Sequence, residues 1–350
     1  MSEIVIILIE ASIKALVIVL IMQLMAAVNV YMERKVSAFI QGRIGPNRVG
    51  PWGTFQPFAD VFKLFMKEDV VPKSADKFFH SLAPIISMGI AFSIWAVIPF
   101  SSYIEIDGRK FYMGMAPNLN IGVLYILAMT SVGVYGITLA GWSSNSKYSL
   151  LGGLRSSAQM ISYELAMGLS LIAIIMMTGS FTLNDIVSHQ QAWGGWRWNI
   201  FVQPIAFLIF LTASFAETNR APFDLPEAEP ELVGDFNTEY SGMKFGMFFL
   251  AEYANLTTAA VLISLIFLGG WSIPFDASNL GIMEGSIWLA LIHFAVFAIK
   301  VLFIIFFFIW IRWSIPRFRY DQLMNLGWKF LLPLSLLNAV ITAFYVMFLQ

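Results

Sequence analysis

The stretch that decides the fold is IVIILIEASIKALVIVLIMQLMAAVNVYM, residues 4–32, in which polar side chains are rare. A helix that spans a membrane needs roughly 20 mainly apolar residues. At ~1.5 Å per residue, a helix over this stretch reaches ~43 Å, which exceeds the ~30 Å thickness of a hydrocarbon core. We therefore expect a long first membrane helix that tilts or protrudes, with Glu10 and Lys14 paired near the outer interface.

The rest of the chain is similarly apolar. Hydrophobic residues make up 58% of it and charged residues 12%, about half the charge of a soluble domain. Further runs that could each form a spanning helix lie at about 81–100, 119–141, 158–178, 200–217, 245–269, 287–311 and 330–349. The sequence therefore predicts an all-α polytopic membrane protein with eight transmembrane helices, all within a single membrane domain over 1–350.

Loop charge predicts the orientation of these helices. The loops after the first, third, fifth and seventh helices hold 16 of the 21 Lys and Arg residues, and the loops after the second, fourth and sixth hold three. Because loops rich in Lys and Arg stay on the cytoplasmic side, the odd-numbered loops are expected there. Both termini are then expected on the periplasmic or outer side.

The predicted cytoplasmic loop over 33–79 contains a second kind of helix. In FQPFADVFKLFMKE (55–68), polar residues and phenylalanines recur at intervals of three and four on opposite faces. This pattern predicts an amphipathic helix that lies at the membrane interface. The preceding GRIGPNRVGPWG (42–53) is rich in Gly and Pro, which predicts a shaped loop. Its Arg43 and Arg48 leave two interpretations open: a flexible connector, or a docking or ligand-binding mouth.

A second predicted cytoplasmic loop, over 217–244, is strongly acidic. It includes AETNRAPFDLPEAEPELVG (216–234), and the only base between positions 217 and 239 is Arg220. The acids in this interval are Glu217, Asp224, Glu227, Glu229, Glu231, Asp235 and Glu239. A solvated loop usually balances its acids with lysines, so this excess of carboxylates favours a functional role over a merely soluble surface.

Ionisable residues inside spanning helices are costly and are candidates for function. Glu164, Glu217 and Glu252 lie on consecutive predicted helices, each within about two turns of the cytoplasmic face. Closely spaced buried carboxylates cannot all ionise, so such a layer could pass protons or respond to a nearby charge. The alternative for Glu164 is a local hydrogen bond to Tyr163 or Ser162. His293 and Lys300 share a face of the seventh helix, where we expect a polar contact within the chain or with a neighbouring subunit.

Several chemistries are excluded by what the chain lacks. There is no cysteine, so disulfides, cysteine-ligated iron–sulfur clusters and thiolate zinc sites are excluded. The three histidines are scattered, and we predict no metal site. With a net charge of −1, the chain shows no electrostatic signature of nucleic-acid binding. No phosphate-binding glycine-rich loop or catalytic Ser constellation is present, so any redox cofactor would reside on partner proteins.

Three long segments resemble one family: ERKVSAFIQGRIGPNRVGPWGTFQPFADVFKLFMKED (33–69), GWSSNSKYSLLGGLRSSAQMISYE (141–164) and AETNRAPFDLPEAEPELVGDFNTEYSGMKFGMFFLAEYAN (216–255). They are similar to the H subunit of bacterial NADH:quinone oxidoreductase, respiratory complex I, and the likeness covers essentially the whole chain. The resemblance implies a multi-pass subunit in the bacterial inner membrane. It also implies a quinone tunnel shared with peripheral-arm subunits, and coupling of quinone reduction to proton translocation.

The resemblance also implies cofactors and partners. Ubiquinone or menaquinone is the expected substrate, and FMN and iron–sulfur clusters are expected only on partner subunits. Those partners are the peripheral-arm quinone-site subunits, which carry the last iron–sulfur cluster, and the small and antiporter-like membrane subunits. By their match to the family's motifs, the quinone-tunnel residues are Glu33, Arg34, Arg43, Arg48 and Asp60. The implied proton-coupling residues are Glu164, Glu217, Glu227, Glu229, Glu231 and Glu252, with Arg220 and Asp224 beside them.

Three alternatives remain at this point. The nearest is a membrane subunit of a group-4 hydrogenase or a related dehydrogenase complex. A stand-alone ion transporter is the second, although such proteins usually bind their ions near the membrane midplane, whereas these acids cluster near one face. A structural anchor is the third, and it predicts that Glu217→Gln and Glu164→Gln leave quinone reductase activity and proton pumping intact.

Overall fold

The computed structural model describes residues 3–106, 109–191, 197–224, 235–272 and 285–349. Within these residues, seven helices are long and apolar enough to cross a membrane, which makes the chain a mainly helical, multi-pass membrane protein. They are α1 (Glu3–Ile40), α3 (Lys77–Ile94), α4 (Gly122–Ser143), α5 (Lys147–Thr178), α10 (Gly242–Phe267), α11 (Ile287–Ser314) and the run Tyr320–Phe348. That last run comprises α12 (Tyr320–Asn325), a π-helical turn η5 (Leu326–Leu331) and most of α13 (Leu332–Leu349).

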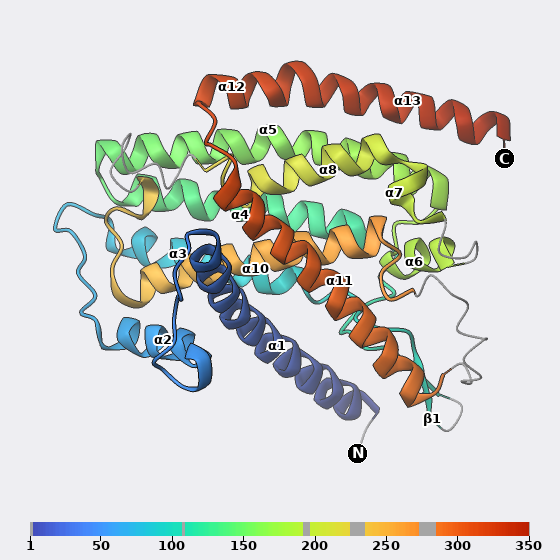
Figure 1. The fold of residues 1–350 in the computed structure, drawn as a ribbon, viewed down its shortest axis with the longest axis horizontal. Coiled ribbons are helices and arrows are strands. Elements are labelled where there is room, and N and C mark those ends of the chain that lie inside the picture. The colour runs from blue at the N-terminus through green and yellow to red at the C-terminus, as the bar shows by residue number, and fades with distance from the viewer. Residues whose placement is uncertain (1–2, 107–108, 192–196, 225–234, 273–284, 350) are drawn as a thin grey trace.

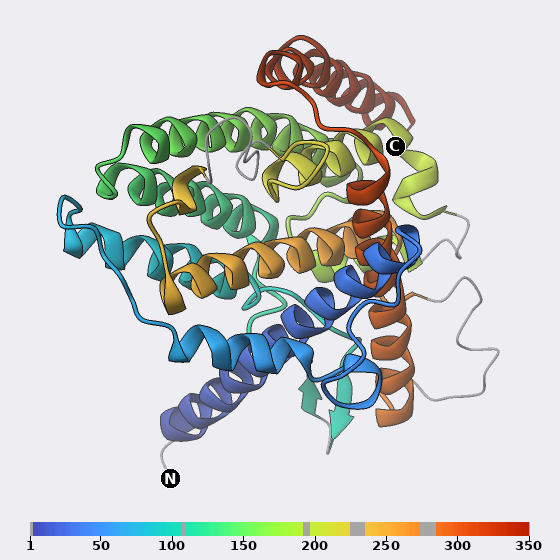
Figure 2. The same ribbon diagram turned by 60° about the vertical axis from the view of Figure 1, so that its left-hand side comes forward.

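The helices form a bundle around α10. Helices α3, α4, α5 and α10 run side by side, whereas α1 and α11 cross them obliquely (Figure 1). Helices α12 and α13 lie along one edge of the bundle, with α13 against α5 (Figure 2). Because α1, α3, α8 (Pro204–Glu217) and α11 all pack on α10, that helix is buried along most of its length.

The helix predicted over 200–217 is divided in the structure. It forms a single turn, α7 (Asn199–Val202), and then α8, which has 14 residues. The break falls at Gln203, whose φ is −128°, and Pro204 follows it with no backbone N–H to donate. At ~1.5 Å per residue α8 is ~21 Å long, too short to span a membrane on its own. Among the described residues, seven of the eight predicted spanning helices are therefore long and apolar enough to cross a membrane, and the remaining one is divided.

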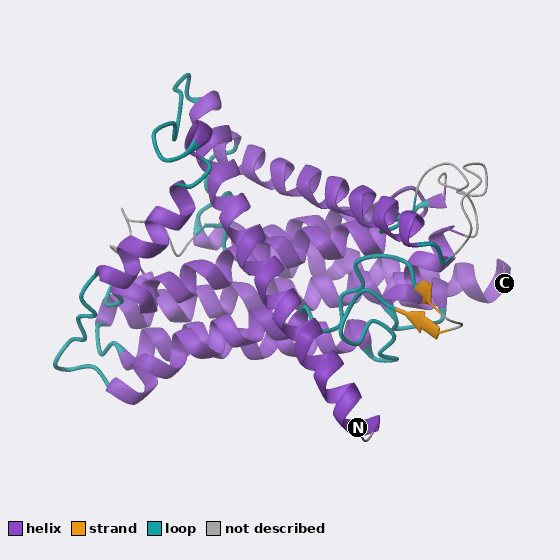
Figure 3. Ribbon diagram, turned by 90° about the horizontal axis from the view of Figure 1, so that it is seen from below, coloured by secondary structure: helices purple, strands orange, loops and turns teal. Residues whose placement is uncertain are grey.

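The all-α fold includes one small β-hairpin that the sequence did not indicate. Strands β1 (Ile104–Ile106) and β2 (Arg109–Phe111) form a two-stranded antiparallel sheet beside the first turn of α11 (Figure 3). The backbone N–H of Glu105 donates to the Gly285 carbonyl oxygen at 2.9 Å, which attaches the sheet to the segment before α11. The strands have only three residues each, too few for a recognisable alternation of polar and apolar positions.

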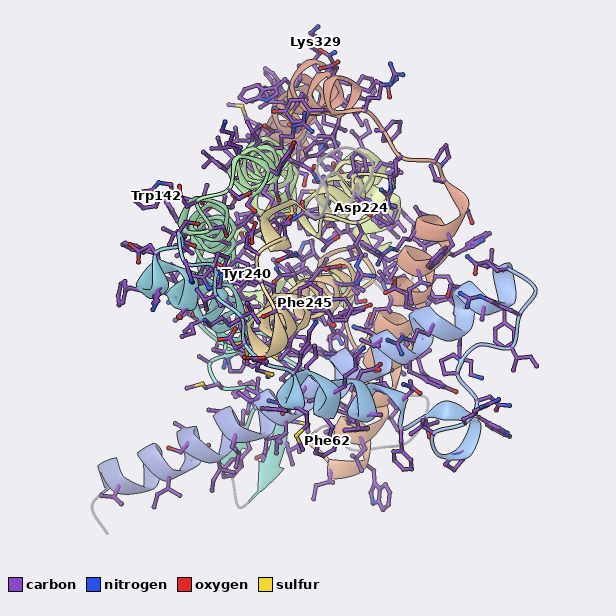
Figure 4. The ribbon with its side chains drawn as sticks, turned by 90° about the vertical axis from the view of Figure 1, so that its left-hand side faces the viewer. Phe62, Trp142, Asp224, Tyr240, Phe245 and Lys329 are labelled. Atoms are coloured by element: carbon purple, nitrogen blue, oxygen red, sulfur yellow. The ribbon has the colours of Figure 1, made fainter. Side chains whose placement is uncertain are left out.

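The first loop folds into a shaped turn followed by the expected short helix. Helix α2 occupies Gln56–Met66, and its Phe58, Phe62 and Phe65 are exposed. Phe62, labelled beside α2 in Figure 4, is 69% exposed. A short 3-10 turn, η1 (Pro51–Gly53), precedes α2. Gly53 has a φ of +81°, and a Cβ there would lie 2.5 Å from the Pro46 carbonyl, so only glycine fits this turn. The remaining elements are α6 (Leu183–Gln191) and η3 (Asp235–Asn237).

Lys300 caps the carboxyl end of α10. Its Nζ donates to the carbonyl oxygens of Leu268, Gly270 and Ser272 at 2.7–2.8 Å and lies 4.3 Å from the ring centroid of Trp198. A cation is stabilising there because the last carbonyls of a helix lack partners and carry partial negative charge. The polar contact expected at Lys300 is therefore made within the chain. His293 Nδ1 similarly lies 2.8 Å from Ser102 Oγ.

We expect Lys300→Met to lower the free energy of unfolding by about 2 kcal/mol or more, because three buried carbonyls lose a charged donor. Thermal denaturation of the detergent-solubilised protein measures the loss. Lys14→Met is the matched control, since Lys14 makes one exposed ion pair with Glu10 at 2.7 Å. An equal loss of stability in both variants would contradict the assignment.

Candidate functional site

A buried arginine lies at the centre of the polar interior. Arg220 follows α8 in a tight turn, and its side chain is 1% exposed. Its Nη1 lies 2.8 Å from Glu33 Oε2, its Nη2 lies 3.1 Å from Glu252 Oε1, and its guanidinium lies 4.5 Å from the Tyr253 ring centroid. Burying a guanidinium costs several kcal/mol unless carboxylates compensate it. Two carboxylates from different helices do so here.

Glu33 is the shared acceptor of this group. It lies near the carboxyl end of α1 and accepts a hydrogen bond from Tyr253 Oη at 2.7 Å. It also forms an ion pair with Arg312 at the end of α11. Glu33, Arg220, Glu252, Tyr253 and Arg312 together make up what we call the Arg220 cluster. It joins α1, α10, α11 and the turn after α8 at one point.

The charge state of Arg220 follows from its neighbours. Burial acts to lower the pKa of the guanidinium, but the nearby carboxylates of Glu33 and Glu252 outweigh burial and hold the pKa above its ordinary value. Arg220 therefore remains cationic at any physiological pH. A change of charge at Glu33 or Glu252 consequently alters how strongly Arg220 interacts with the other carboxylate.

A cavity of about 80 Å³ lies beside the Arg220 cluster. Its polar lining comprises Ser87, Thr130, Glu217, Thr218, Asn219, Asn237, Glu252 and Asn255. A water molecule occupies ~30 Å³ in the liquid, so a polar cavity of this size can hold several waters. A smaller cavity of about 30 Å³ shares Glu217, Thr218 and Asn255 with it. Glu252 thus faces both Arg220 and a polar space that also contains Glu217.

Glu164 joins the same region through hydroxyl groups. Its carboxylate accepts hydrogen bonds from Thr130 Oγ1 at 3.2 Å and from Ser131 Oγ, both on α4. The alternative of a local bond to Tyr163 or Ser162 is wrong, because Tyr163 donates to the Leu323 carbonyl and Ser162 to the Ala158 carbonyl. Since Thr130 lines the cavity, Glu164 is connected through this hydroxyl to the space that Glu217 and Glu252 line.

The rest of the acidic loop is only partly within the described residues. Asp224 is buried beside Arg220's turn and forms an ion pair with Arg317 at 3.4 Å (Figure 4). Glu227, Glu229 and Glu231 lie outside the described residues. Tyr240 closes the loop, and burial raises the pKa of its hydroxyl to about 12 although the group hydrogen-bonds Ser143.

The residues predicted for a quinone tunnel fall into two groups. Arg34 pairs with Asp60 of α2 at 2.7 Å, and the Arg34 side chain is 43% exposed. Arg43 donates to Gln41 at 2.7 Å, and Arg48 is exposed on the same loop. Glu33, by contrast, points into the Arg220 cluster. Two adjacent residues of α1 thus point in different directions. Arg34 contacts Asp60 in the first loop, whereas Glu33 contacts the buried Arg220.

Sequence reasoning missed Tyr253 and Arg312. Tyr253 is adjacent to Glu252, and this proximity in sequence is a signal that could have identified it. Arg312 ends an apolar helix, where the sequence indicates only a loop charge that sets orientation. Among the described residues, no group of three or more His, Asp or Glu side chains is arranged to hold a metal ion.

Comparison with known proteins identifies the family. A family model described as NADH dehydrogenase matches residues 13–343. The chain is 54% identical to NADH-quinone oxidoreductase subunit 8 of Rhodothermus marinus, over 94% of this chain and 95% of the relative. It is 52% identical to the H subunit of the NADH-quinone oxidoreductase of Salinibacter ruber, over 94% of each chain. It is 48% identical to the H subunit of the Flavobacterium johnsoniae enzyme, over 95% and 94%. The chain therefore belongs to the NADH dehydrogenase family of membrane proteins, the family of the H subunits of NADH-quinone oxidoreductase.

Proposed function

We propose that this chain binds quinone at its first loop and couples quinone reduction to proton translocation through its buried carboxylates. The observation that carries the proposal is that one buried arginine, Arg220, holds Glu33 and Glu252 together. Glu33 belongs to the helix that leads into the first loop, and Glu252 lines the polar cavity. A signal at the loop can therefore reach the cavity through two ion pairs.

The coupling follows from electrostatics. Quinone takes up protons together with electrons, so its reduction near the first loop changes the local charge. If Glu33 pairs more tightly with Arg220, the interaction of Arg220 with the Glu252 carboxylate weakens, and the proton affinity of Glu252 rises. Glu252 then takes up a proton from the cavity, where the next carboxyl group is that of Glu217. The two carboxyl groups of Glu217 and Glu164 lie close enough to interact electrostatically.

Hydroxyl groups and waters complete the proposed route. A hydroxyl can donate one hydrogen bond and accept others, so Thr130 can relay a proton between the cavity and Glu164. From Glu164 the change would pass to neighbouring small and antiporter-like membrane subunits. This chain holds and moves protons, whereas FMN and the iron–sulfur clusters belong to partner subunits in the proposal.

The first loop suits the proposed quinone. Arg34 and Asp60 fix α2 against α1, and the exposed phenylalanines of α2 offer an apolar surface to an isoprenoid tail. We assign Arg43 and Arg48 to the tunnel mouth, facing the peripheral-arm subunits. The same proposal places α2 at the interface of a bacterial inner membrane and both termini on the outer side. It takes α7 and α8 together as an eighth, interrupted crossing.

We expect Glu217→Gln in the assembled enzyme to lower proton translocation driven by NADH:quinone reduction by about tenfold, because an acid–base group contributes at least that much. Acidification measured in inverted membrane vesicles tests this, with NADH oxidation by ferricyanide as the measure of intact partner subunits. Glu10→Gln is the control, since Glu10 pairs only with Lys14 in the described contacts. Wild-type proton translocation in Glu217→Gln would exclude the proposal and favour a structural anchor.

We expect Arg220→Met to cost about 3–5 kcal/mol, because two buried carboxylates lose their shared counter-charge. Arg220→Lys should recover little of this, since one ammonium cannot hold two carboxylates in a fork. The temperature at which the solubilised enzyme loses activity provides the measurement. Lys14→Met, which removes an ammonium paired with Glu10 where both side chains are about a third or more exposed, should cost no more than about 1 kcal/mol. Similar losses at both positions would show that Arg220 has no special role.

We expect Arg34→Ala and Arg48→Ala each to raise the apparent KM for a short-chain quinone by about threefold, the effect of ~0.7 kcal/mol of lost binding. Steady-state NADH:quinone reductase assays measure it. Lys110→Ala removes a cation from the distant β-hairpin, where Lys110 lies over the Tyr103 ring at 4.5 Å, and should leave KM unchanged. If neither arginine variant alters KM, the mouth lies elsewhere.

A further inference from the structure

One buried amide lies outside the acid groups yet contacts the turn that carries them. Gln159 on α5 is 0% exposed. Its Nε2 lies 2.7 Å from the Ala216 carbonyl oxygen, 2.8 Å from the Phe223 carbonyl oxygen and 3.3 Å from Asn219 Oδ1. These three acceptors belong to both limbs of the turn between α8 and Asp224. The amide of Gln159 therefore holds the two limbs of the turn together.

The orientation of this amide is determined by its partners. All three contacts are oxygen acceptors, and only the NH₂ end of the side chain can donate to them. The turn itself is unusual, because Asn219 has a φ of +50°, in the left-handed region that residues other than glycine rarely adopt. Further hydrogen bonds hold it at its ends, from Arg220 N to Phe215 O and from Phe223 N to Arg220 O. Gln159 is the side chain that joins one limb to the other.

Gln159 acts directly next to the two residues on which coupling depends. Glu217 follows Ala216, and Arg220 follows Asn219. A shift of either acceptor therefore moves a carboxylate of the cavity or the guanidinium between Glu33 and Glu252. We propose that Gln159 is a positioning residue for proton coupling: it fixes the orientation of the Glu217 and Arg220 side chains relative to each other. This inference rests on the proposed function.

A purely architectural role is the competing interpretation. Helices α5 and α8 pack together without Gln159, and Tyr163 contacts the Phe223 ring edge-on at 5.4 Å. If Gln159 only joined these helices, its loss would reduce the amount or stability of the enzyme and leave the coupling of each assembled molecule unchanged. The two roles therefore predict different turnover and proton translocation per assembled enzyme, whereas both allow a loss of stability.

Gln159→Met keeps the length of the side chain and removes both donors. In the assembled enzyme we expect NADH:quinone turnover and the associated proton translocation to fall by about tenfold, at an unchanged apparent KM for quinone. NADH–ferricyanide activity, which depends on partner subunits, normalises for the amount of enzyme. Because both residues act at one site, Gln159→Met should cause no further loss when added to Glu217→Gln.

Gln190→Met is the matched control. Gln190 is 1% exposed and clamps the far end of α10, where it accepts from Gly269 N and donates to the Leu265 carbonyl at 3.0 Å each. Gln190→Met should lower the stability of the enzyme and leave its turnover per enzyme unchanged. In the double variant with Glu217→Gln, the losses of stability should add.

Three results bear on the inference. Wild-type turnover and proton translocation per enzyme in Gln159→Met, or a loss that multiplies with that of Glu217→Gln, overturns the inference while leaving the proposed function intact. Wild-type proton translocation in Glu217→Gln itself overturns both. If Gln159→Met does not assemble, Gln159→Asn retains a donor but shortens its reach by one methylene. Lowered turnover and proton translocation per enzyme in assembled Gln159→Asn support the inference, and wild-type values overturn it.

Discussion

The burial of Arg220 between Glu33 and Glu252 is the constraint on which the rest of the interior depends. A guanidinium cannot be taken out of water without carboxylates placed to compensate it. Those carboxylates come from α1 and α10, and Arg312 of α11 meets Glu33 from the other side. Four separate segments must therefore converge before any one of these charges can be buried. This requirement sets where α1 and α11 cross the bundle.

Arg220 and Lys300 contact α10 at two separate places. Near the middle of the helix, Glu252 and Tyr253 face Arg220, and beyond its carboxyl end Lys300 donates to three carbonyl oxygens. Between them, α10 is almost entirely buried, although Thr257, Thr258 and Ser264 are polar. A helix held at two places in this way has little freedom to rotate. We infer that changes of charge at Glu252 are transmitted as changes of protonation and pairing, rather than as movement of α10.

The same geometry explains why the acids can be both buried and responsive. Three donors of the Arg220 cluster form hydrogen bonds to Glu33, and these bonds stabilise its ionised carboxylate. Glu217 and Glu164 have weaker support, from a polar cavity and from hydroxyl groups on α4. Groups that are held by waters and hydroxyls change protonation at lower cost than groups locked in ion pairs. The contacts of Glu33 therefore differ in kind from those of Glu217 and Glu164.

The sequence alone determined that this is a helical membrane protein, because backbone groups in lipid must pair within their own segment and each span is therefore visible locally. It also predicted that Glu164, Glu217 and Glu252 lie in one layer, since depth is expected to follow from counting residues along each helix. Only the tertiary structure decided the partners. Glu33 meets Arg220 across 187 positions and Gln159 meets Phe223 across 64, and no local pattern encodes such contacts. The break before α8 and the β-hairpin were also beyond the sequence, because a single proline and three-residue strands leave too weak a periodic signal. The angles at which the helices cross determine which residues meet, and those angles depend on side-chain packing throughout the bundle.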